Sequence, residues 1–513
     1  MRTIPELFAH AADAGMEIET EAGRTPVAAL AERACAVAAG LRDLGVTPGE
    51  RVACWLPNSP DYLTLQAATA RLGAILVAVN NRFGTLEVAD IVGRSESRVL
   101  VVADAAALPA LRHLVVLTPG ETDARSPWSQ VAAHGFAELA ATAPGGEDLS
   151  HSDALSNIFT TSGTTAAPKF AAHAQSSVVG HAVDVAAAIG LSRPDCLSLQ
   201  LLPYCGVFGF GQATGTLAAG VDMLMPAGFD AAVVARTINE RGVTHLLATD
   251  DMIHRMLDSL APDAAAPVFP SLRVAAFALF NSALSGLPDR AEALGVPMRA
   301  PFGMSEVFAL FAVRGAEDTP EDRHRAGGRL INEGARVRVR DPESGDLLPH
   351  GAVGELEIKG PYMFREYFGN PAASRAAMTD DGYLRTGDLG YTESADAFTY
   401  LQRANDTLRL SGLLVSPAEI ESVVMEQAGI HAAQVVAVGT ENGNRPVAFV
   451  ITEDGAAPDE AAVIAGVGRV LPKFKTPVRV IALAEFPVTK GANGTKIQRA
   501  KLRQMAEAAL AAG

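Results

Sequence analysis

Hydroxyl side chains gather around one glycine at residues 160–169, which read TTSGTTAAPK and follow an apolar run at 155–159. The backbone N–H and side-chain O–H groups of such a loop can converge on phosphate oxygens, and Lys169 adds a positive charge on a flexible stem. The segment is not a Walker loop, because Pro168 precedes the lysine and Phe170 follows it. Taken alone, such a segment is more often a solvated Ser/Thr turn between a strand and a helix.

Four further segments with chemically useful residues follow along the chain: FGMSE at 302–306, YLRTGDLG at 383–390, QRAND at 402–406 with SG at 411–412, and NGTKIQR at 493–499. Together with the loop, they resemble the signature motifs of the adenylate-forming (AMP-binding) superfamily, which includes acyl-CoA synthetases, luciferases and peptide-synthetase adenylation domains. One such motif would be weak, whereas five in the family's order over nearly the whole chain are specific. The chain is identified by this resemblance as an acyl-CoA synthetase, of the acyl- or aryl-CoA ligase type.

The resemblance implies a reaction in two steps. ATP and a carboxylic acid first form an acyl-adenylate with release of pyrophosphate, and the acyl group then passes to the thiol of CoA with release of AMP. Negative charge has to be stabilised around the α-phosphate in the first step. The implied cofactors are ATP, Mg2+ and CoA.

By resemblance, the loop binds the β- and γ-phosphates of ATP through Thr161, Ser162, Gly163, Thr164, Thr165 and Lys169. Glu306 offers the oxygen ligand that Mg2+ prefers, so it is expected to be a catalytic residue and the metal ligand. Ala166 and Phe170 stand where the family has glycines, but the hydroxyl groups and the lysine remain.

The resemblance also implies the nucleoside contacts. The adenine contacts are expected from Asn281, Ser282, Ala283, Phe302, Gly303, Met304 and Ser305, with the Phe302 ring available for stacking. Asp388 can accept both ribose hydroxyls, and Arg403 can assist it. Considered alone, Asp388 and Arg403 are equally compatible with a turn residue and a surface ion pair.

Lys496 is the residue expected to catalyse adenylation. Its ammonium group can bridge the substrate carboxylate and the α-phosphate, which lowers the repulsion between two anions. The resemblance implies that the C-terminal domain carrying Lys496 rotates about a hinge at Asn405 once pyrophosphate has left. The segment with Ser411, Gly412 and Leu413 then lines a tunnel for the pantetheine arm of CoA, because glycine permits close backbone approach.

The segment LPYCGVFGFG at 202–211 resembles the stretch that borders the acyl pocket in the family. The residues expected to line that pocket are Tyr204, Cys205, Gly206, Phe210 and Phe308. Many members carry histidine where this chain has Gly206. The pocket residues are apolar and partly aromatic, and no acid stands where amino-acid-activating domains hold an α-amine, so an apolar aliphatic or aryl acid is the expected substrate. Core packing is the alternative explanation for aromatic residues in this stretch.

Hydrophobic patterning predicts the elements that position these segments. Residues 26–45 have helical spacing, and two apolar strands at 50–57 and 74–80 enclose a helix at 63–73. Strand, helix and strand in this order imply parallel pairing through right-handed crossovers. Short apolar strands continue to about residue 280, so an α/β body with sheets buried on both faces is expected.

The pattern changes twice after this body. Residues 335–341 and 354–360 alternate strictly, which predicts a half-exposed antiparallel sheet, the small β-barrel-like part of the large domain. Beyond residue 404 come a capped amphipathic helix, two strands and a further helix. We therefore expect a large N-terminal ATP- and acyl-binding domain at 1–404 and a small mobile α+β lid domain at 405–513 that carries the catalytic lysine.

Composition excludes several classes of protein. The chain has 42 basic and 58 acidic residues with no basic cluster, so nucleic acid is an unfavourable partner. The uncharged stretch at 196–221 contains Pro203 and several glycines, which favours a buried strand and helix over a membrane span. The four scattered cysteines and the start without a signal-peptide pattern predict a cytoplasmic location. The oligomeric state stays open, with a homodimer among the options.

Two alternatives to a CoA ligase remain open from the sequence. An acyl- or aryl-AMP ligase would load the thiol of a separate carrier protein. A non-catalytic acyl or nucleotide sensor would keep the fold alone, but retention of both Glu306 and Lys496 argues against it. A dinucleotide oxidoreductase is excluded, because the third glycine of its fingerprint would fall at Thr214.

Overall fold

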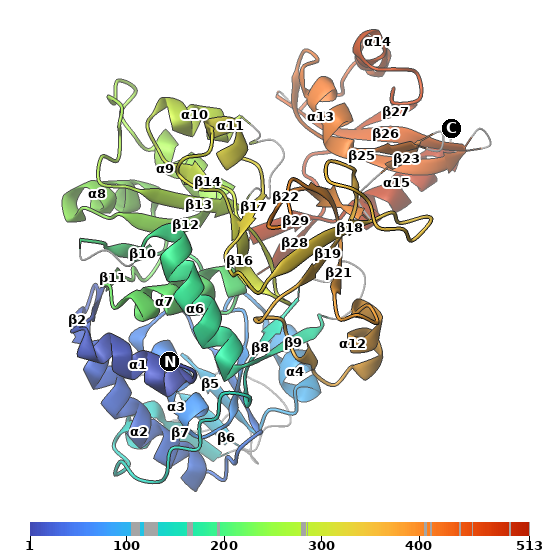
Figure 1. Cartoon of the computed structure of the whole chain (residues 1–513). Helices are drawn as coiled ribbons and strands as arrows, with labels where there is room; N and C mark the ends of the chain where they lie inside the picture. Colours follow the sequence, from blue (N-terminus) through green and yellow to red (C-terminus); the bar gives the residue numbers. More distant parts are fainter. Residues whose placement is uncertain are drawn as a thin grey trace.

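The computed structural model describes residues 1–103, 113–116, 132–161, 168–191, 195–278, 284, 286–404, 408–410, 413–440, 443–453, 455–491 and 494–511. Figure 1 shows an N-terminal body, coloured from blue through yellow to light orange, and a C-terminal part, coloured darker orange to red, that projects from it.

The first sheet of the body is mainly parallel. In the described residues its order is β20-β9-β8-β4-β3-β5-β6-β7. The strands are β3 (Arg51–Trp55), β4 (Ile75–Ala78), β5 (Val99–Val102), β6 (His113–Val116), β7 (Ala132–Gly135), β8 (Leu155–Thr160), β9 (Phe170–Ala174) and β20 (Glu366–Tyr367). Strands β3 and β4 pair in parallel through helix α3 (Pro60–Arg71), as the sequence predicts. At one edge of the sheet, β9 pairs antiparallel with β8, and β20 pairs antiparallel with β9.

The second sheet is also mainly parallel and contains the uncharged stretch. Its described order is β14-β13-β12-β10-β11-β1-β2. The strands are β1 (Glu17–Thr20), β2 (Gly23–Pro26), β10 (Ser198–Gln200), β11 (Met223–Leu224), β12 (His245–Thr249), β13 (Val274–Ala278) and β14 (Met298–Arg299). Residues 196–221 form β10 and the buried helix α7 (Val207–Ala219), which confirms the prediction of a buried strand and helix. No helix in the described ranges is both long and apolar enough to cross a membrane.

The third sheet is antiparallel and carries the motif residues at 302–304, 384–390 and 402–403. Its described order is β15-β16-β17-β22-β21-β19-β18. The strands are β15 (Phe302–Met304), β16 (Phe308–Val313), β17 (Gly327–Leu330), β18 (Arg336–Arg340), β19 (Gly354–Lys359), β21 (Leu384–Thr392) and β22 (Ala397–Arg403). Buried residues alternate with more exposed ones in β18, as predicted for a half-exposed strand, whereas β19 does not alternate and is buried at four of its six residues. The sheet already begins at Phe302, before the change of pattern that the sequence shows.

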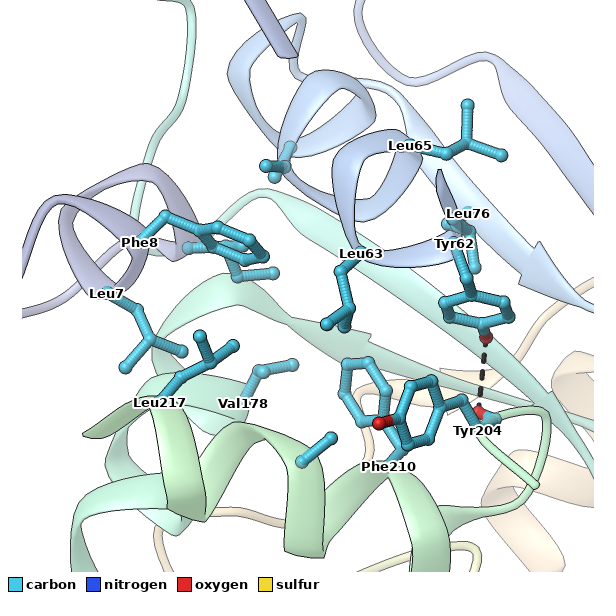
Figure 2. Packing of buried hydrophobic residues seen from close by; sticks show 14 of the residues in the cluster. Leu7, Phe8, Tyr62, Leu63, Leu65, Leu76, Val178, Tyr204, Phe210 and Leu217 are labelled. Carbon is cyan, nitrogen blue, oxygen red and sulfur yellow. Dashed lines mark hydrogen bonds between the residues drawn. The ribbon is translucent and has the colours of Figure 1, made fainter. Parts of the chain in front are cut away.

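The helices of the body cover the first two sheets (Figure 1). Besides α3 and α7 they are α1 (Ile4–Asp13), α2 (Val27–Asp43), α4 (Thr85–Arg94), α5 (Phe136–Ala140), α6 (Gln175–Ile189), α8 (Ala231–Arg241), α9 (Asp250–Asp258), α10 (Leu287–Ala293), α11 (Pro320–Arg323) and α12 (Pro371–Ala377). Figure 2 shows the core between them, where Phe8, Leu63 and Leu217 meet from three helices. The Tyr62 hydroxyl donates to the Tyr204 carbonyl oxygen at 3.1 Å in the same core.

The C-terminal part has its own cores. Its elements are β23 (Leu408–Leu410), β24 (Leu413–Val415), α13 (Pro417–Met425), β25 (Ile430–Thr440), β26 (Gly443–Thr452), α14 (Glu460–Val470), β27 (Arg479–Ala482), β28 (Val488–Gly491), β29 (Gly494–Ile497) and α15 (Arg499–Ala511). Among the described residues, the buried clusters of this part contain only residues from 408 onward, and those of the body end at Phe398. Separate cores are what two independently packed units require.

Candidate active site

The strands on either side of the predicted phosphate loop hold its two ends together. Strands β8 and β9 pair antiparallel up to Thr160 and Phe170. The Thr161 N–H then donates to the Lys169 carbonyl oxygen at 2.9 Å, and the Lys169 N–H donates to Thr161 Oγ1 at 3.2 Å. The loop therefore starts and ends at fixed points. The four residues Ser162, Gly163, Thr164 and Thr165 lie outside the described residues.

An arginine that sequence reasoning missed supports one end of this loop. Arg94, the last residue of α4, donates from Nη1 to the Pro168 carbonyl oxygen at 2.9 Å. Its guanidinium lies 4.4 Å from the centroid of the Phe170 ring, which is buried in the core of the first sheet. The ring of Phe170 therefore packs away from the loop. Basic residues are common in the last turn of a helix, so no sequence signal distinguished Arg94.

Glu306 sits at a tight hairpin between β15 and β16. A Cβ atom on Gly303 would lie 2.5 Å from the Ala309 Cα and 2.7 Å from the Phe308 carbonyl oxygen, so only glycine lets the two strands approach this closely. Glu306 follows in the turn and is 6% exposed. The Phe364 N–H donates to its carbonyl oxygen at 2.7 Å, which fixes its backbone.

Tyr367 connects Glu306 with the end of the phosphate loop. Its hydroxyl donates to Glu306 Oε1 at 2.7 Å, and the Lys169 Nζ lies 4.5 Å from the centroid of its ring. Burial, followed by the nearby Glu306 carboxylate, raises the pKa of the Tyr367 hydroxyl well above its usual range. The positive charge of the Arg403 guanidinium lowers the pKa of the same hydroxyl, so Arg403 also interacts electrostatically with Tyr367. The structure thus brings Lys169 and Glu306 together on one tyrosine that sequence reasoning missed.

The donor chemistry at Glu306 fits a cation that is held mainly by phosphate oxygens. Among the described residues, no three His, Cys, Asp or Glu side chains converge on a point where they could hold a metal ion. Glu306 supplies one buried carboxylate instead. Mg2+ commonly keeps several waters and binds through one or two carboxylates plus substrate phosphates. Glu306 therefore suits the Mg2+ of a bound nucleotide.

The segment after Glu306 is strained and is held by two histidines. Phe308 and Leu310 have φ values of +62° and +58°, which cost side-chain-bearing residues about 1–3 kcal/mol each. His173 Nε2 lies 2.8 Å from the Ser305 carbonyl oxygen, and His181 Nε2 bonds to the Ala309 carbonyl oxygen. The ring of Phe308 stacks on that of His181 with centroids 4.9 Å apart. The two histidines therefore fix the backbone on both sides of Glu306.

Acid should destabilise the protein through these two histidines. Burial lowers the pKa of His173 and of His181 to about 4, whereas an unfolded histidine titrates near 6.5. Below about pH 6.5 the unfolded chain therefore binds more protons. The free energy of unfolding contributed by each ring is fully present above pH 6.5 and is lost as the pH falls toward 4, by at most about 1.4 kcal/mol per pH unit.

The measurement is thermal unfolding at pH 7 and pH 5. The melting temperature should fall more for the native protein than for His181→Gln, since glutamine keeps a donor for the Ala309 carbonyl oxygen and does not titrate. An equal fall in both proteins would show that His181 does not contribute.

Asp388 and Arg403 form a pair on adjacent strands. Arg403 Nε lies 3.1 Å from Asp388 Oδ1, and the Asp388 side chain is 1% exposed. Gly387 has a φ of +68°, the left-handed conformation that turns the chain immediately before the aspartate. The Asp388 N–H donates to Thr386 Oγ1 at 3.0 Å. A carboxylate fixed in this way can accept hydrogen bonds from a diol.

The residues expected around adenine are only partly described. Asn281, Ser282 and Ala283 lie outside the described residues, which stop at the end of β13 and start again at Leu284. The ring of Phe302 packs in the core, with centroids 5.1 Å from Phe398 and 5.7 Å from Tyr400. Met304 is partly exposed, and Ser305 is held through its carbonyl oxygen as described above.

The residues expected around the acyl group lie at the start of α7 and in β16. Gly206 is the residue before α7, and Tyr204, Cys205, Phe210 and Phe308 are each at most 3% exposed. Tyr204 packs edge-on against Tyr62 at 5.5 Å between centroids, and Phe210 lies 5.2 Å from Phe159 (Figure 2 shows Tyr62, Tyr204 and Phe210). Burial raises the pKa of the Cys205 thiol to about 12, which keeps it protonated. These side chains belong to a packed core.

Lys496 lies in the two-stranded hairpin of β28 and β29. Its backbone pairs with Thr489, while its side chain lies outside the described part. In the view of Figure 1 the hairpin is drawn at the boundary between the C-terminal part and the body. The hinge residue Asn405 and the tunnel residues Ser411 and Gly412 are not among the described residues, and Leu413 is described only as the start of β24.

A buried ion pair anchors the chain just after this hairpin. Arg499 Nη2 donates to Glu421 Oε1 at 3.0 Å and to Gln434 Oε1 at 3.1 Å. The same Glu421 oxygen accepts from the Val435 N–H at 2.9 Å, and the Glu421 side chain is 1% exposed. Helix α15, which begins at Arg499, is thereby tied to α13 and β25.

Arg499→Gln should therefore destabilise the C-terminal part by about 3 kcal/mol, because Glu421 would keep its buried charge without a cation. Amide hydrogen exchange resolved by peptide should become faster beyond residue 408 and stay unchanged in β3, β4 and β8. Arg503→Gln, on the exposed face of the same helix, is the control and should leave exchange unchanged. Slow exchange in both variants would contradict the anchoring role.

Two family profiles match the chain. The profile described as AMP-binding enzyme covers residues 20–368, and the profile described as AMP-binding enzyme C-terminal domain covers residues 419–492. A methyl-dioxo-octahydro-indenyl propanoyl:CoA ligase from Mycobacterium tuberculosis is 30% identical over 91% of each chain. A 2-succinylbenzoate–CoA ligase from Bacillus cereus is 26% identical over 96% of this chain and 95% of its own.

Solved structures share the whole fold. ATP-bound MatB from Rhodopseudomonas palustris is 25% identical, with a TM-score of 0.82 over 98% of this chain and 99% of its own. The apo form of the same protein gives a TM-score of 0.72 over the same shares. The present structure is therefore closer to the ATP-bound form than to the apo form.

Proposed function

The chain belongs to the AMP-binding enzymes, and from this membership we propose that it is an AMP-forming carboxylate–CoA ligase with an apolar aliphatic or aryl acid as substrate. The observation that carries the proposal is the meeting of Lys169, from the phosphate loop, and the buried Glu306 on Tyr367. Binding a nucleoside triphosphate requires a cation near the phosphates and a ligand for Mg2+, and Lys169 and Glu306 can supply these two groups.

In the first half-reaction, a carboxylate oxygen of the acid attacks the α-phosphorus of ATP, and pyrophosphate leaves. The loop from Thr161 to Lys169 holds the β- and γ-phosphates, and Mg2+ bound at Glu306 would neutralise charge on them. Asp388 accepts the ribose hydroxyls, with Arg403 beside it. The Lys496 ammonium bridges the two reacting anions and reduces their repulsion.

In the second half-reaction, the CoA thiol loses its proton and attacks the acyl carbonyl carbon, and AMP leaves with the oxygen that the acid contributed. We propose that residues 405–513 move as a lid about Asn405 between the two steps, so that Ser411, Gly412 and Leu413 replace Lys496 beside the adenylate. The separate cores on either side of residue 404 and the greater similarity to an ATP-bound structure support a movable lid held in the adenylation pose.

The acyl group is expected to lie against the start of α7, with the buried Phe308 in the core behind it. Tyr204, Cys205 and Phe210 pack into the core behind this region, so they would form a rigid wall with no charge. Gly206 adds no side chain at the point where α7 begins. Such a wall favours an apolar acyl group over one with a charged amine.

Pyrophosphate release measured over a panel of aliphatic and aryl acids, with and without CoA, tests this proposal. Acid-dependent release together with a CoA thioester supports the ligase. An adenylate that accumulates when CoA is present favours transfer to a carrier-protein thiol instead. ATP binding without release for any acid would contradict the ligase and favour a sensor.

A further inference from the structure

We propose that Tyr367 is a positioning residue for the triphosphate site: its hydroxyl orients the Glu306 carboxylate toward the Mg2+ of MgATP, and its ring holds the Lys169 ammonium beside the phosphate loop. The inference rests on the proposed function, because it concerns the nucleotide site of that reaction. Tyr367 lies outside the five segments that resemble signature motifs of the family.

Tyr367 is itself held rigidly enough to orient other groups. It lies in β20 opposite Ala171 of β9, two residues beyond Lys169, where the phosphate loop ends. Its N–H donates to Ser374 Oγ at 2.9 Å, and its ring packs against Phe364 with centroids 4.7 Å apart. Only 4% of the residue is exposed. The backbone, ring and hydroxyl are therefore all fixed by contacts that do not involve a ligand.

The hydroxyl acts on the rotation of the Glu306 carboxylate. The Glu306 backbone is fixed by the Phe364 N–H, but its side chain still has rotatable bonds. A hydrogen bond of 2.7 Å from Tyr367 to Oε1 selects one orientation of the carboxylate. A residue that forms a hydrogen bond to a metal-ligating side chain typically contributes about 10- to 100-fold to metal affinity.

The ring acts on Lys169. This lysine is exposed and has a long flexible stem, so its ammonium group would otherwise sample many positions. An ammonium 4.5 Å from a ring centroid is attracted to the ring face. One side chain thus holds a cation at its ring and a carboxylate at its hydroxyl.

Two variants of Tyr367 separate these roles. Tyr367→Phe removes the hydroxyl and keeps the ring, whereas Tyr367→Leu removes both. Tyr362→Phe is the matched control. Tyr362 lies five residues before Tyr367 in the chain, and its hydroxyl also donates to a carboxylate, that of Asp184. Its loss should cost similar stability without touching Glu306 or Lys169.

ATP binding measured by calorimetry at increasing Mg2+ concentrations gives a readout that does not depend on turnover. We expect Tyr367→Phe to lose about tenfold in Mg2+-dependent ATP affinity and to keep its affinity without Mg2+. Tyr367→Leu should in addition lose about two- to fivefold in the absence of Mg2+. The Mg2+ concentration for half-maximal pyrophosphate release should rise in Tyr367→Phe, and the rate should recover at saturating Mg2+.

Equal Mg2+ dependence in the native protein, Tyr367→Phe and Tyr362→Phe would overturn the inference. So would a loss in Tyr367→Phe that saturating Mg2+ does not restore, because that is the behaviour of a purely structural tyrosine. Both results leave the proposed function intact, since the native protein would still release pyrophosphate with an acid. Absence of that release in the native protein would contradict the proposed function, while the calorimetry would still decide the role of Tyr367.

Discussion

Lys496→Ala is expected to lower the rate of adenylate formation by about 100- to 1000-fold and to leave thioester formation from a supplied acyl-adenylate nearly unchanged. In the first half-reaction two anions approach each other, and removing a group that stabilises the charge of such a transition state typically costs this much. In the second half-reaction a thiol attacks an adenylate that has already formed, so no second anion has to approach the α-phosphate.

The two rates can be measured separately, by acid-dependent pyrophosphate release and by CoA thioester formation from synthetic acyl-adenylate. Lys490→Ala is the matched control, because Lys490 pairs with Thr495 in the same hairpin, next to the pair formed by Thr489 and Lys496. It should change neither rate by more than about twofold. Equal losses in both half-reactions for Lys496→Ala would contradict the assigned role.

Glu306→Gln is expected to lower adenylate formation by about 100-fold or more. The amide has the same shape, and its oxygen can still accept the Tyr367 hydroxyl, so the hairpin should stay folded. The negative charge that binds Mg2+ is lost, and with it the neutralisation of the phosphates that leave. Thioester formation from supplied acyl-adenylate should be spared, because pyrophosphate takes no part in it.

Pyrophosphate release titrated with Mg2+ measures this effect. Glu366→Gln, one residue before Tyr367 and outside the buried group around Glu306, should behave as the native protein does. A Glu306→Gln enzyme with the native Mg2+ dependence would show that the metal binds elsewhere.

The charged residues of the candidate site were proposed from the resemblance of five local motifs to those of a known family, because such residues stand in short contiguous patterns. Glu306 and Asp388 were predicted in this way, and the structure places both as buried carboxylates with defined partners. The parallel first sheet was also predicted, since β3, α3 and β4 are contiguous in sequence and their apolar patterns are distinct.

What the sequence could not reveal depends on pairs that are distant in the chain. His181 bonds to the carbonyl oxygen of Ala309, and Tyr367 lies beside Ala171, so neither partner can be read from neighbouring residues. A histidine or tyrosine within an apolar stretch has the same local pattern whether it supports a core or a site. Strand β1 was missed for a related reason, because it joins the second sheet only through β11, about 200 residues later.

The fate of the oxygen atoms of the acid tests the central claim most directly. The acid that gives the highest pyrophosphate release should be labelled with 18O in both carboxylate oxygens and converted with ATP and CoA, and the products analysed by mass spectrometry. Attack of the carboxylate on the α-phosphorus predicts one 18O atom in AMP and one in the thioester. Label in inorganic phosphate with ADP as the nucleotide product, or unlabelled AMP, would contradict an acyl-adenylate and with it the account of this site.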